Sequence, residues 1–341
     1  MAPTGSLLML VRGMGLANGI QVGEVTSPVA FNQDLRAIVP PPTVDSRFLL
    51  LALRHCLADG AKGVLSSAAH GTLKIDADAL RQVEFPVPPL HEQRRIVAIL
   101  DKAFEGIATA KANAERNVQN ARDLFASWRE AVLSTSGHGW DEAPLYDLCD
   151  IKHGYAFEGE FFAAEGDYVL LTPGNYFESG GYRDRGGKQK YFIGQIPSDY
   201  ILSEGSLLVA MTEQAAGLLG SPLLVPESDR FLHNQRLGLV AGKPGVPWVN
   251  DFFFHAFNLS RVRAEIHASA SGVKVRHTSP SKIGAVRVAF PTTVAAQREA
   301  ASTLVKLAEE CDQLVSVHER KLTALDELKK SLLHQAFSGD F

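Results

Sequence analysis

The chain has 341 residues with 34 Lys plus Arg against 38 Asp plus Glu, a formal net charge of -4. The length favours two domains, and the charge balance excludes a protein that coats nucleic acid through bulk positive charge, although it leaves room for local basic patches. The 45% hydrophobic content, three scattered cysteines without a CxxC pair and the lack of a long apolar run predict a globular cytoplasmic protein without disulfides, structural zinc or a membrane segment.

An internal repeat divides the chain. Gly5-Ser6-Leu7-Leu8 recurs as Gly205-Ser206-Leu207-Leu208, and Gln93-Arg94 recurs as Gln297-Arg298, so the offset drifts from 200 to 204. A colinear series of such matches indicates domain duplication, since the period is far longer than a solenoid unit. The predicted regions are a partial first module at 1–88, a helix at 89–137, a second module at 138–291 and a second helix at 292–341.

The first module is predicted to be incomplete. Residues 138 to 204, which open the second copy, have no counterpart in the first copy. We therefore expect a duplicated chain that is short of its first 60 to 70 residues.

The first long helix follows a proline-bearing stretch and contains no proline. Apolar residues recur along it at spacings of three and four, which is typical of a coiled coil. These positions are Ile96, Leu100, Ala103, Ile107, Ala110, Ala114, Val118, Ala121, Phe125, Trp128 and Val132. Simple dimerisation would explain such a helix, but its place after a repeat copy favours antiparallel pairing with the second helix of the same chain.

The second module reads as mainly β with short helices. Runs such as Tyr168 to Leu171, Tyr191 to Ile193, Ser206 to Met211 and Val286 to Val288 predict strands between Gly and Pro turns. Residues 248–263 could form one short helix with apolar positions at 252, 253, 256 and 257. The predicted fold class is therefore α+β, with two such modules separated by two long antiparallel helices.

The second long helix shows the same spacing. Its predicted contact positions are Leu304, Leu307, Cys311, Leu314, His318, Lys321, Leu325, Leu328 and Leu332. His318 and Lys321 are polar residues in this series, and such residues more often set the register of a coiled coil than bind a ligand.

No catalytic pattern is present in the sequence. Pro40-Pro41-Pro42 lacks the flanking residues of an amino-methyltransferase quartet, and no GxxxxGK[ST] phosphate loop occurs. His55, Cys56 and His233 lack the spaced partners of a metal or nucleophile site, so a structural role is the simpler interpretation. We expect no catalytic residue, no metal and no cofactor.

Two polar stretches of the second module are candidates for DNA contact. The loop at 175–191 combines glycines and tyrosines with four cations, Arg183, Arg185, Lys188 and Lys190. Arg can read guanine and Lys can bind phosphate, while a solvated hairpin explains this composition equally well. A second patch contains Lys274, Arg276, His277 and Lys282. Residues 138 to 290 hold 14 Lys plus Arg against 17 Asp plus Glu, so a DNA-binding face must be local.

Several motifs resemble one family. Phe85-Pro86-Val87-Pro88-Pro89-Leu90-His91-Glu92-Gln93-Arg94-Arg95-Ile96 resembles the I-P-L-P-P-L-x-E-Q-x-x-I signature that opens the conserved helices of type I restriction–modification specificity subunits. The tail from Leu325 to Gly339 resembles the C-terminal ending of that family. Arg12-Gly13, Phe31 to Arg36 and His233 to Leu237 are similar to motifs of its target-recognition domains. The resemblance covers essentially the whole chain.

The resemblance implies a non-catalytic subunit that reads a bipartite double-stranded DNA site. Each target-recognition domain would contact one half-site, and the antiparallel helices would fix the gap between them. The helices would also dock two methyltransferase subunits, and the assembly would recruit ATP-dependent restriction subunits. Base flipping for methylation would be performed by the partner. The family pattern adds Arg12 and Gln214 to the candidate DNA-binding residues.

The sequence departs from the family in three places, which keeps an alternative open. The first recognition domain lacks the counterpart of 138–204, Glu213-Gln214 stands where Arg12-Gly13 stands in the first copy, and the second signature has one extra residue and no Glu before Gln297. The alternative is a degenerate scaffold that holds methyltransferase subunits and reads at most one half-site. A self-contained methyltransferase is disfavoured by the missing catalytic quartet.

Overall fold

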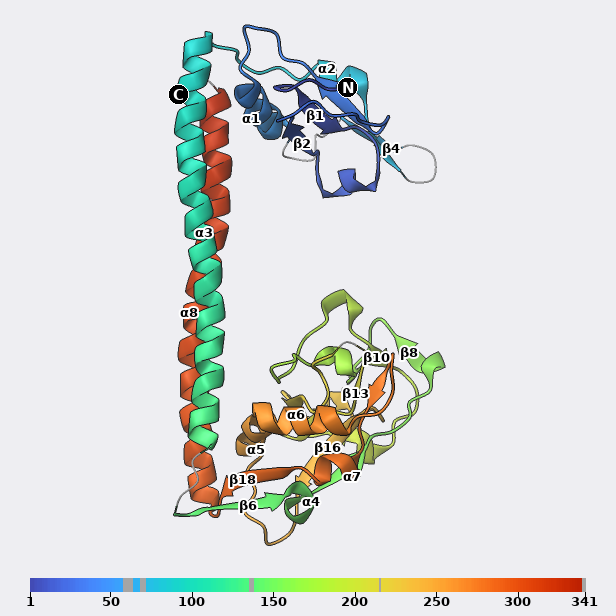
Figure 1. Cartoon of the computed structure of the whole chain (residues 1–341). Coiled ribbons are helices and arrows are strands. Elements are labelled where there is room, and N and C mark those ends of the chain that lie inside the picture. Colours follow the sequence, from blue (N-terminus) through green and yellow to red (C-terminus); the bar gives the residue numbers. More distant parts are fainter. Residues whose placement is uncertain (58–63, 68–71, 135–137, 215, 339–341) are drawn as a thin grey trace. The chain divides into compact units, whose positions relative to one another are not determined.

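The structure is a computed structural model that describes residues 1–57, 64–67, 72–134, 138–214 and 216–338. The chain divides into two compact units, one formed by Met1–Gln119 with Leu314–Phe341 and the other by Asn120–Gln313. Both units contain helices and short strands, and two helices of the chain are much longer than the others (Figure 1). The predicted α+β fold with two long helices is confirmed. Gly339 of the C-terminal motif lies outside the described residues.

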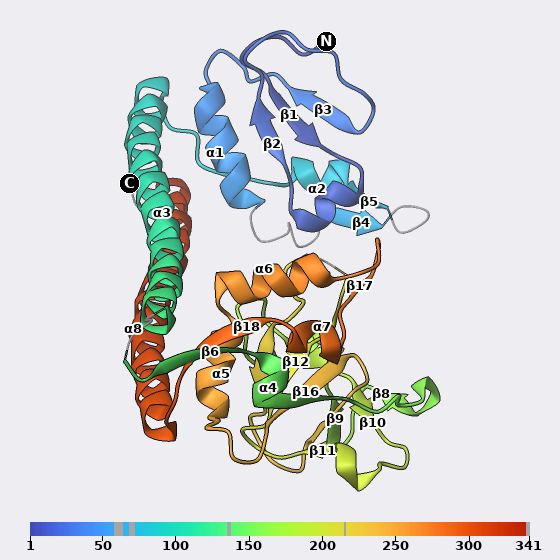
Figure 2. The same ribbon diagram turned by 60° about the horizontal axis from the view of Figure 1, so that its bottom comes forward.

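The first unit contains a three-stranded antiparallel sheet in the order β2-β1-β3. Helix α1 lies against this sheet (Figure 2). Leu7 and Met9 of β1 point into a core that α1 completes with Leu50 and Leu53. The Asp45 carboxylate begins α1 by accepting hydrogen bonds from the backbone N–H groups of the first turn. The elements are β1 (Leu7–Leu10), η1 (Met14–Asn18), β2 (Val22–Glu24), β3 (Leu35–Ile38), α1 (Ser46–Cys56), β4 (Leu65–Ser67), β5 (Leu73–Ile75) and α2 (Ala77–Arg81).

Two helix segments complete the first unit. Helix α3 (Leu90–Leu133) begins here and helix α8 (Val294–Ser338) ends here. Ile96 and Leu100 near the start of α3 pack with Ala336 and Phe337 near the end of α8, which makes this pair antiparallel. Lys111 Nζ and Asp326 Oδ1 form an ion pair at 2.7 Å across it.

The second unit is built on a four-stranded sheet in the order β14-β12-β16-β7 and a five-stranded sheet in the order β11-β15-β9-β10-β8. Two further ribbons pair β18 with β6 and β13 with β17. The strands are β6 (Trp140–Pro144), β7 (Cys149–His153), β8 (Phe162–Ala163), β9 (Tyr168–Leu170), β10 (Tyr191–Phe192), β11 (Ile201–Leu202), β12 (Leu207–Ala210), β13 (Thr212–Glu213), β14 (Pro222–Leu224), β15 (Phe231–Leu232), β16 (Leu237–Gly242), β17 (Arg276–His277) and β18 (Arg287–Pro291).

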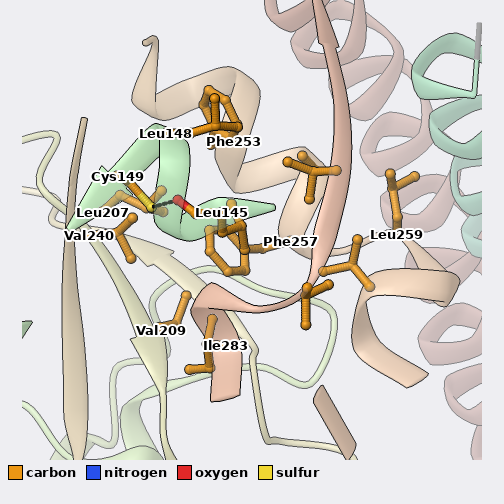
Figure 3. Close-up of a cluster of buried hydrophobic side chains, with 14 of the residues drawn as sticks. Leu145, Leu148, Cys149, Leu207, Val209, Val240, Phe253, Phe257, Leu259 and Ile283 are labelled. Carbon is orange, nitrogen blue, oxygen red and sulfur yellow. Dashed lines mark hydrogen bonds between the residues drawn. The ribbon is translucent and has the colours of Figure 1, made fainter. Parts of the chain in front are cut away.

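Short helices surround these sheets. They are α4 (Leu145–Leu148), η3 (Gly159–Phe161), η4 (Pro173–Asn175), η5 (Gly186–Lys188), η6 (Ser198–Tyr200), α5 (Asn250–Phe257), α6 (Ser260–Ser269) and α7 (Pro280–Gly284). Figure 3 shows the main core, where Phe253 and Phe257 of α5 approach Leu207 and Val209 of β12. Leu133 of α3 joins the same core together with the first turns of α8, so each long helix contributes one of its ends to each unit.

The strand register agrees with the internal repeat. Leu7 pairs with Glu24 in the first unit, and Leu207 pairs with Leu224 in the second, an offset of 200 on both strands. Leu8 pairs with Ala37, and Leu208 pairs with Leu239. The sheet β2-β1-β3 therefore repeats as β14-β12-β16, and α1 repeats as α5.

Two local predictions were wrong. Residues 248–263 form two helices, because the backbone turns at Asn258 and Leu259 between α5 and α6. In α8, Leu314 and Leu328 are about half exposed, at 48% and 47%, and Lys321 is also exposed. The half-buried positions between Cys311 and Leu325 are Val315, His318 and Leu322, so the contacts predicted at Leu314 and Lys321 lie one residue later. The predicted positions of α3 are all buried or half-buried.

Candidate nucleic-acid interface

A buried amide pair holds the 175–191 loop. Asn175 is fully buried and its Nδ2 donates to Gln189 Oε1 at 2.9 Å, which ties the two ends of the loop together. Asn175 Oδ1 accepts from Thr172 N at 3.0 Å and Thr172 Oγ1 at 2.9 Å. Since buried polar groups are costly to leave unpaired, this network fixes one backbone path for the loop. Sequence analysis missed both amides, because their signal is an ordinary polar residue in a loop.

The four predicted cations of this loop lie along its surface. Arg183 is exposed, and its guanidinium lies 5.9 Å from the centre of the Phe177 ring. Lys190 is exposed, with its Nζ 5.4 Å from the centre of the Phe162 ring. Arg185 is half-buried against the backbone of Gly174, and Lys188 is exposed at the end of η5. The loop therefore presents cations beside aromatic rings on a backbone held by buried hydrogen bonds.

A short ribbon brings the other predicted residues together. Strand β13 pairs with β17 so that Thr212 faces His277 and Glu213 faces Arg276. Gln214 and Lys274 follow and precede these strands at the same end of the ribbon, and both are exposed. His277 is exposed and its Nδ1 lies 3.2 Å from Thr212 Oγ1. Lys282 is not part of this ribbon. It lies in α7, where its side chain is half-buried.

Arg276 is held by internal partners. Its Nη1 lies 3.3 Å from Glu213 Oε1, and its Nη2 donates to the carbonyl oxygen of His267 at 2.5 Å. The Glu213 side chain is only 1% exposed, and its Oε2 accepts hydrogen bonds from the backbone N–H groups of Gly217, Leu218 and Leu219 at 2.9 to 3.1 Å. Burial lowers the pKa of His267, with the neighbouring Glu213 acting in the opposite direction. This cluster fixes the turn after β13.

Arg263 of α6 connects this turn with the 175–191 loop. Its Nη1 donates to the carbonyl oxygen of Glu178 at 3.0 Å, and its Nη2 contacts the carbonyl oxygen of Gly217. Burial lowers the pKa of Arg263 to about 10, with Arg129 contributing further. Arg263 therefore connects the two candidate surfaces through its guanidinium. No sequence signal marks it, since it is an ordinary arginine in a short helix.

In the first unit, Arg12 is exposed and forms an isolated bridge with Lys74. Thr212 forms the equivalent bridge with His277 in the second unit, since the offset of 200 holds through β1 and β12. The structure thus aligns Arg12-Gly13 with Thr212-Glu213, and the sequence alignment with Glu213-Gln214 was wrong by one residue. The equivalent positions therefore differ in exposure as well as in side chain, because Arg12 is exposed and Thr212 is buried at 8% exposure.

The buried histidines and cysteines are part of the packing. Burial lowers the pKa of His233 and of His255 to about 4 each, and it raises the pKa of Cys149 to about 12. Within the described ranges, no group of three or more His, Cys, Asp and Glu residues is arranged to hold a metal ion. The same residues include no helix that is both long enough and apolar enough to cross a membrane.

The fold defines a class of protein: a duplicated α+β module whose two copies share a pair of long antiparallel helices. Residues 17–117 match the model of the type I restriction modification DNA specificity domain. The specificity subunit of the type I restriction enzyme EcoR124I/EcoR124II from Escherichia coli is 29% identical over 135 residues, which are 39% of this chain and 32% of that protein. The match therefore spans about a third of the length of this curated relative.

Solved structures share the fold. A chain from a study of complex assembly and conformational transition of the type I R-M system has a TM-score of 0.76 at 15% identity, covering 100% of this chain and 83% of its own. The HsdS subunit from Thermoanaerobacter tengcongensis has a TM-score of 0.57 at 14% identity, covering 99% and 82%. The partial sequence matches and the shared fold make this chain similar to type I specificity subunits.

Proposed function

We propose that this protein reads a bipartite double-stranded DNA site, with one half-site contacted by each unit. The observation that carries the proposal is the duplicated sheet: β2-β1-β3 and β14-β12-β16 have the same strand order and register, so the chain presents two versions of one recognition scaffold. The match of residues 17–117 to a type I restriction modification DNA specificity domain supports this proposal. Differences between the equivalent loops would give each half-site its own sequence.

In the second unit, the proposed readers are the loop cations and the β13–β17 ribbon. Arg183 and Arg185 would contact base edges, because the planar guanidinium matches the two acceptors of guanine in the major groove. Lys188, Lys190 and Lys274 would bind phosphates, which position the module without reading sequence. Gln214 and His277 are exposed at opposite ends of the ribbon and would reach the groove or the backbone.

Arg276 takes a different part in this proposal. Its guanidinium already binds the Glu213 carboxylate and the His267 carbonyl oxygen. Arg276 would therefore hold the ribbon in position and would not contact a base itself. In the first unit, Arg12 is exposed at the position equivalent to the buried Thr212 and would contact the other half-site.

The long helices would set the distance between the half-sites. Helix α3 starts in the core of the first unit and ends in the core of the second, and α8 does the same in the opposite direction. A helix rises about 1.5 Å per residue, so a length of 44 residues gives a stiff spacer. Two weak half-site contacts on one stiff spacer act as a single sharp site through effective concentration.

We further propose that the helices dock methyltransferase subunits, as two copies, and that ATP-dependent restriction subunits join the assembly. The formal charge of -4 supports an arrangement in which partners contribute much of the DNA affinity. The protein would act in the cytoplasm, where these partners and DNA meet. The alternative is a degenerate scaffold that holds methyltransferase subunits and reads at most one half-site.

Mapping of the methylated motif tests the loop residues. The chain is reconstituted with methyltransferase subunits, and the bases specified in each half-site are read from the methylated DNA. Arg183→Ala or Arg185→Ala should relax base preference in one half-site only, by about 1–3 kcal/mol of discrimination. Lys188→Ala should weaken binding to all sequences and lower the salt dependence by about one phosphate contact.

Lys306→Ala serves as a matched control, since Lys306 is an exposed cation on α8 outside the candidate interface. It should leave the base preference unchanged. An unchanged motif in both arginine variants would argue against the loop, and a footprint on one side only would replace the bipartite model by the scaffold alternative. Deletion of one heptad from each long helix should shorten the gap, and an unchanged gap would remove the spacer role.

A further inference from the structure

The sheet β14-β12-β16-β7 brings two further segments to the end that carries the β13–β17 ribbon. Strand β12 leads into β13, and its last residue, Ala210, pairs with Leu237, the first residue of β16. The next residue of β16, Gly238, pairs with His153, the last residue of β7. Because these neighbouring strands are antiparallel, the turn ahead of β16 and the end of β7 lie at the same end of the sheet as the ribbon.

The turn ahead of β16, residues 233–237, is joined directly to the ribbon. Met211, the residue before β13, donates its N–H to the carbonyl oxygen of Arg236 at 3.0 Å. Within the turn, Asn234 Oδ1 accepts a hydrogen bond from Arg236 N at 3.0 Å. Both backbone groups of Arg236 are therefore held in place, while its side chain is exposed.

The chain that leaves β7 packs against this turn. Tyr155 N donates to the carbonyl oxygen of His233, and Gln235 N donates to the carbonyl oxygen of Tyr155, both at 2.9 Å. A Cβ atom at Gly154 would lie 2.3 Å from the carbonyl oxygen of Asn234, so only glycine permits this close approach. The end of β7 and the turn therefore form one surface with a fixed backbone.

Lys152 and Arg236 are exposed cations of this surface. Neither side chain forms an ion pair with another described residue. Lys152 Nζ lies 4.9 Å from the centre of the Tyr200 ring. Tyr155 is 38% exposed, and its ring centre lies 5.3 Å from that of Tyr200. The surface therefore offers two cations without a carboxylate partner, and aromatic rings lie beside one of them.

The buried histidine of the turn reports the charge around it. Burial lowers the pKa of His233 to about 4, and Lys152 and His153 lower it further. Both charged groups that shift this pKa are basic. An anion that approaches the end of β7 would therefore meet an attractive potential.

The first unit builds the same turn with the opposite charge. Asn32 Oδ1 accepts from Asp34 N at 3.1 Å, and Val11 N donates to the carbonyl oxygen of Asp34 at 2.8 Å. These are the equivalents of the two hydrogen bonds that hold the backbone of Arg236. The turn therefore forms with either side chain, so the arginine of the second unit is not needed to build it.

We propose that Lys152 and Arg236 bind phosphates of the DNA backbone and extend the candidate interface across the end of the sheet. The inference rests on the proposed function, because its ligand is the same DNA duplex. Phosphate contact requires an exposed cation on a fixed backbone, and it positions a protein on DNA without reading sequence. Lys152 and Arg236 would thus hold the second unit in register while the 175–191 loop contacts base edges.

The salt dependence of DNA binding tests these contacts. The full chain is reconstituted with methyltransferase subunits and titrated with duplex DNA that carries the methylated motif, at several salt concentrations. Lys152→Ala and Arg236→Ala should each lower the slope of log affinity against log salt by about 0.9, because each removes one phosphate contact. The methylated motif should stay the same. An unchanged slope in the double variant would overturn the proposal.

Two further variants separate a phosphate contact from other effects of charge. Arg230→Ala removes an exposed arginine that precedes β15 and pairs with Glu227 at 2.9 Å, whereas the turn follows β15. It should leave the slope unchanged, and an equal fall would assign the effect to net charge and refute the two contacts. Arg236→Lys should keep both slope and motif, because a phosphate accepts a hydrogen bond from either cation. A changed motif in this variant would show that Arg236 reads a base instead.

Arg236→Asp reverses the charge without endangering the fold, since Asp34 occupies the same turn in the first unit. It should weaken binding at constant salt by roughly tenfold, and unaltered affinity would contradict the contact. A parent complex that binds no DNA would overturn the proposed function and this inference together. Sequence-specific binding with unchanged slopes would overturn the phosphate contacts alone. Lower slopes, with an unchanged motif in Arg183→Ala and Arg185→Ala, would support the contacts and overturn base reading by the loop.

Discussion

The two sheets of this protein share strand order and register but differ in what covers them. Leu207 and Leu7 are both fully buried on the side of their helix, whereas on the opposite face Leu208 is fully buried and Leu8 is half-buried. Strand pairing and one covered face are therefore enough to preserve the local fold. The second layer adds burial, and with it stability, without changing the backbone of the sheet.

The largest expected effect follows from this difference in burial. Leu208→Ala should cost about 2–5 kcal/mol, because it opens a cavity between two packed layers. Leu8→Ala should cost less than about 1 kcal/mol, because its outer face already meets solvent. Free energies of opening from native-state hydrogen exchange in β12 and β1 would measure the two effects separately. Equal costs would mean that the outer face of the first unit is covered.

The second prediction concerns pH, and it applies to the second unit alone. Burial lowers the pKa of His233 and of His255 to about 4, whereas an unfolded histidine titrates near 6.5. The unfolded state therefore binds protons first, so the stabilisation is complete above pH 6.5 and is lost as the pH falls from 6.5 to 4. Each histidine should contribute about 1.4 kcal/mol per pH unit within that window.

Exchange in β12 measured between pH 7 and pH 4.5 checks this dependence. The equivalents in the first unit are Phe31 and Leu51, which do not titrate, so exchange in β1 provides an internal reference after correction for intrinsic rates. His233→Gln with His255→Gln should flatten the slope in β12. A slope that survives in this double variant would assign the effect to other titrating groups of the second unit, such as His267, whose pKa burial also lowers.

The repeated scaffold was accessible from the sequence because its signals are local or strictly periodic. Gly5-Ser6 and Gly205-Ser206 recur at turns, and a helix seam repeats over many residues. Even there, Leu314 was predicted as a contact position, although Val315 is the half-buried residue. Steps of three and of four residues both fit a heptad, and only the contacts with the partner helix distinguish them.

The candidate site was harder to predict from the sequence, because its geometry depends on contacts between residues that are far apart along the chain. Arg276 looked like a free cation, yet Glu213, 63 residues away, holds it. Arg263 looked unremarkable, yet it joins the 175–191 loop to the turn after β13. Composition indicated where the cations lie, and only the tertiary contacts separated the exposed cations from those with internal partners.

The smallest expected effect is a difference in stability between variants of two equivalent glutamines, one near the start of each long helix. Gln93 and Gln297 are both fully buried, and each donates through Nε2 to two backbone carbonyl groups. Gln93 Oε1 also accepts from Asp45 N at 2.8 Å, whereas Gln297 Oε1 is buried without such a partner among the described residues. Asp45 is the residue that caps α1, and Val249, which precedes α5, has no side-chain cap.

Gln93→Ala should therefore destabilise its unit by about 1 kcal/mol more than Gln297→Ala destabilises the other, because it leaves the Asp45 N–H unpaired as well. Exchange of the first α1 amides against the first α5 amides would measure this difference. Gln297→Glu supplies the converse check, since a carboxylate loses the Nε2 donor that both carbonyl groups use and should cost at least as much as alanine. If Gln93→Ala proves no more costly, water replaces the Asp45 contact, and the two helix junctions are energetically equivalent despite their different hydrogen bonds.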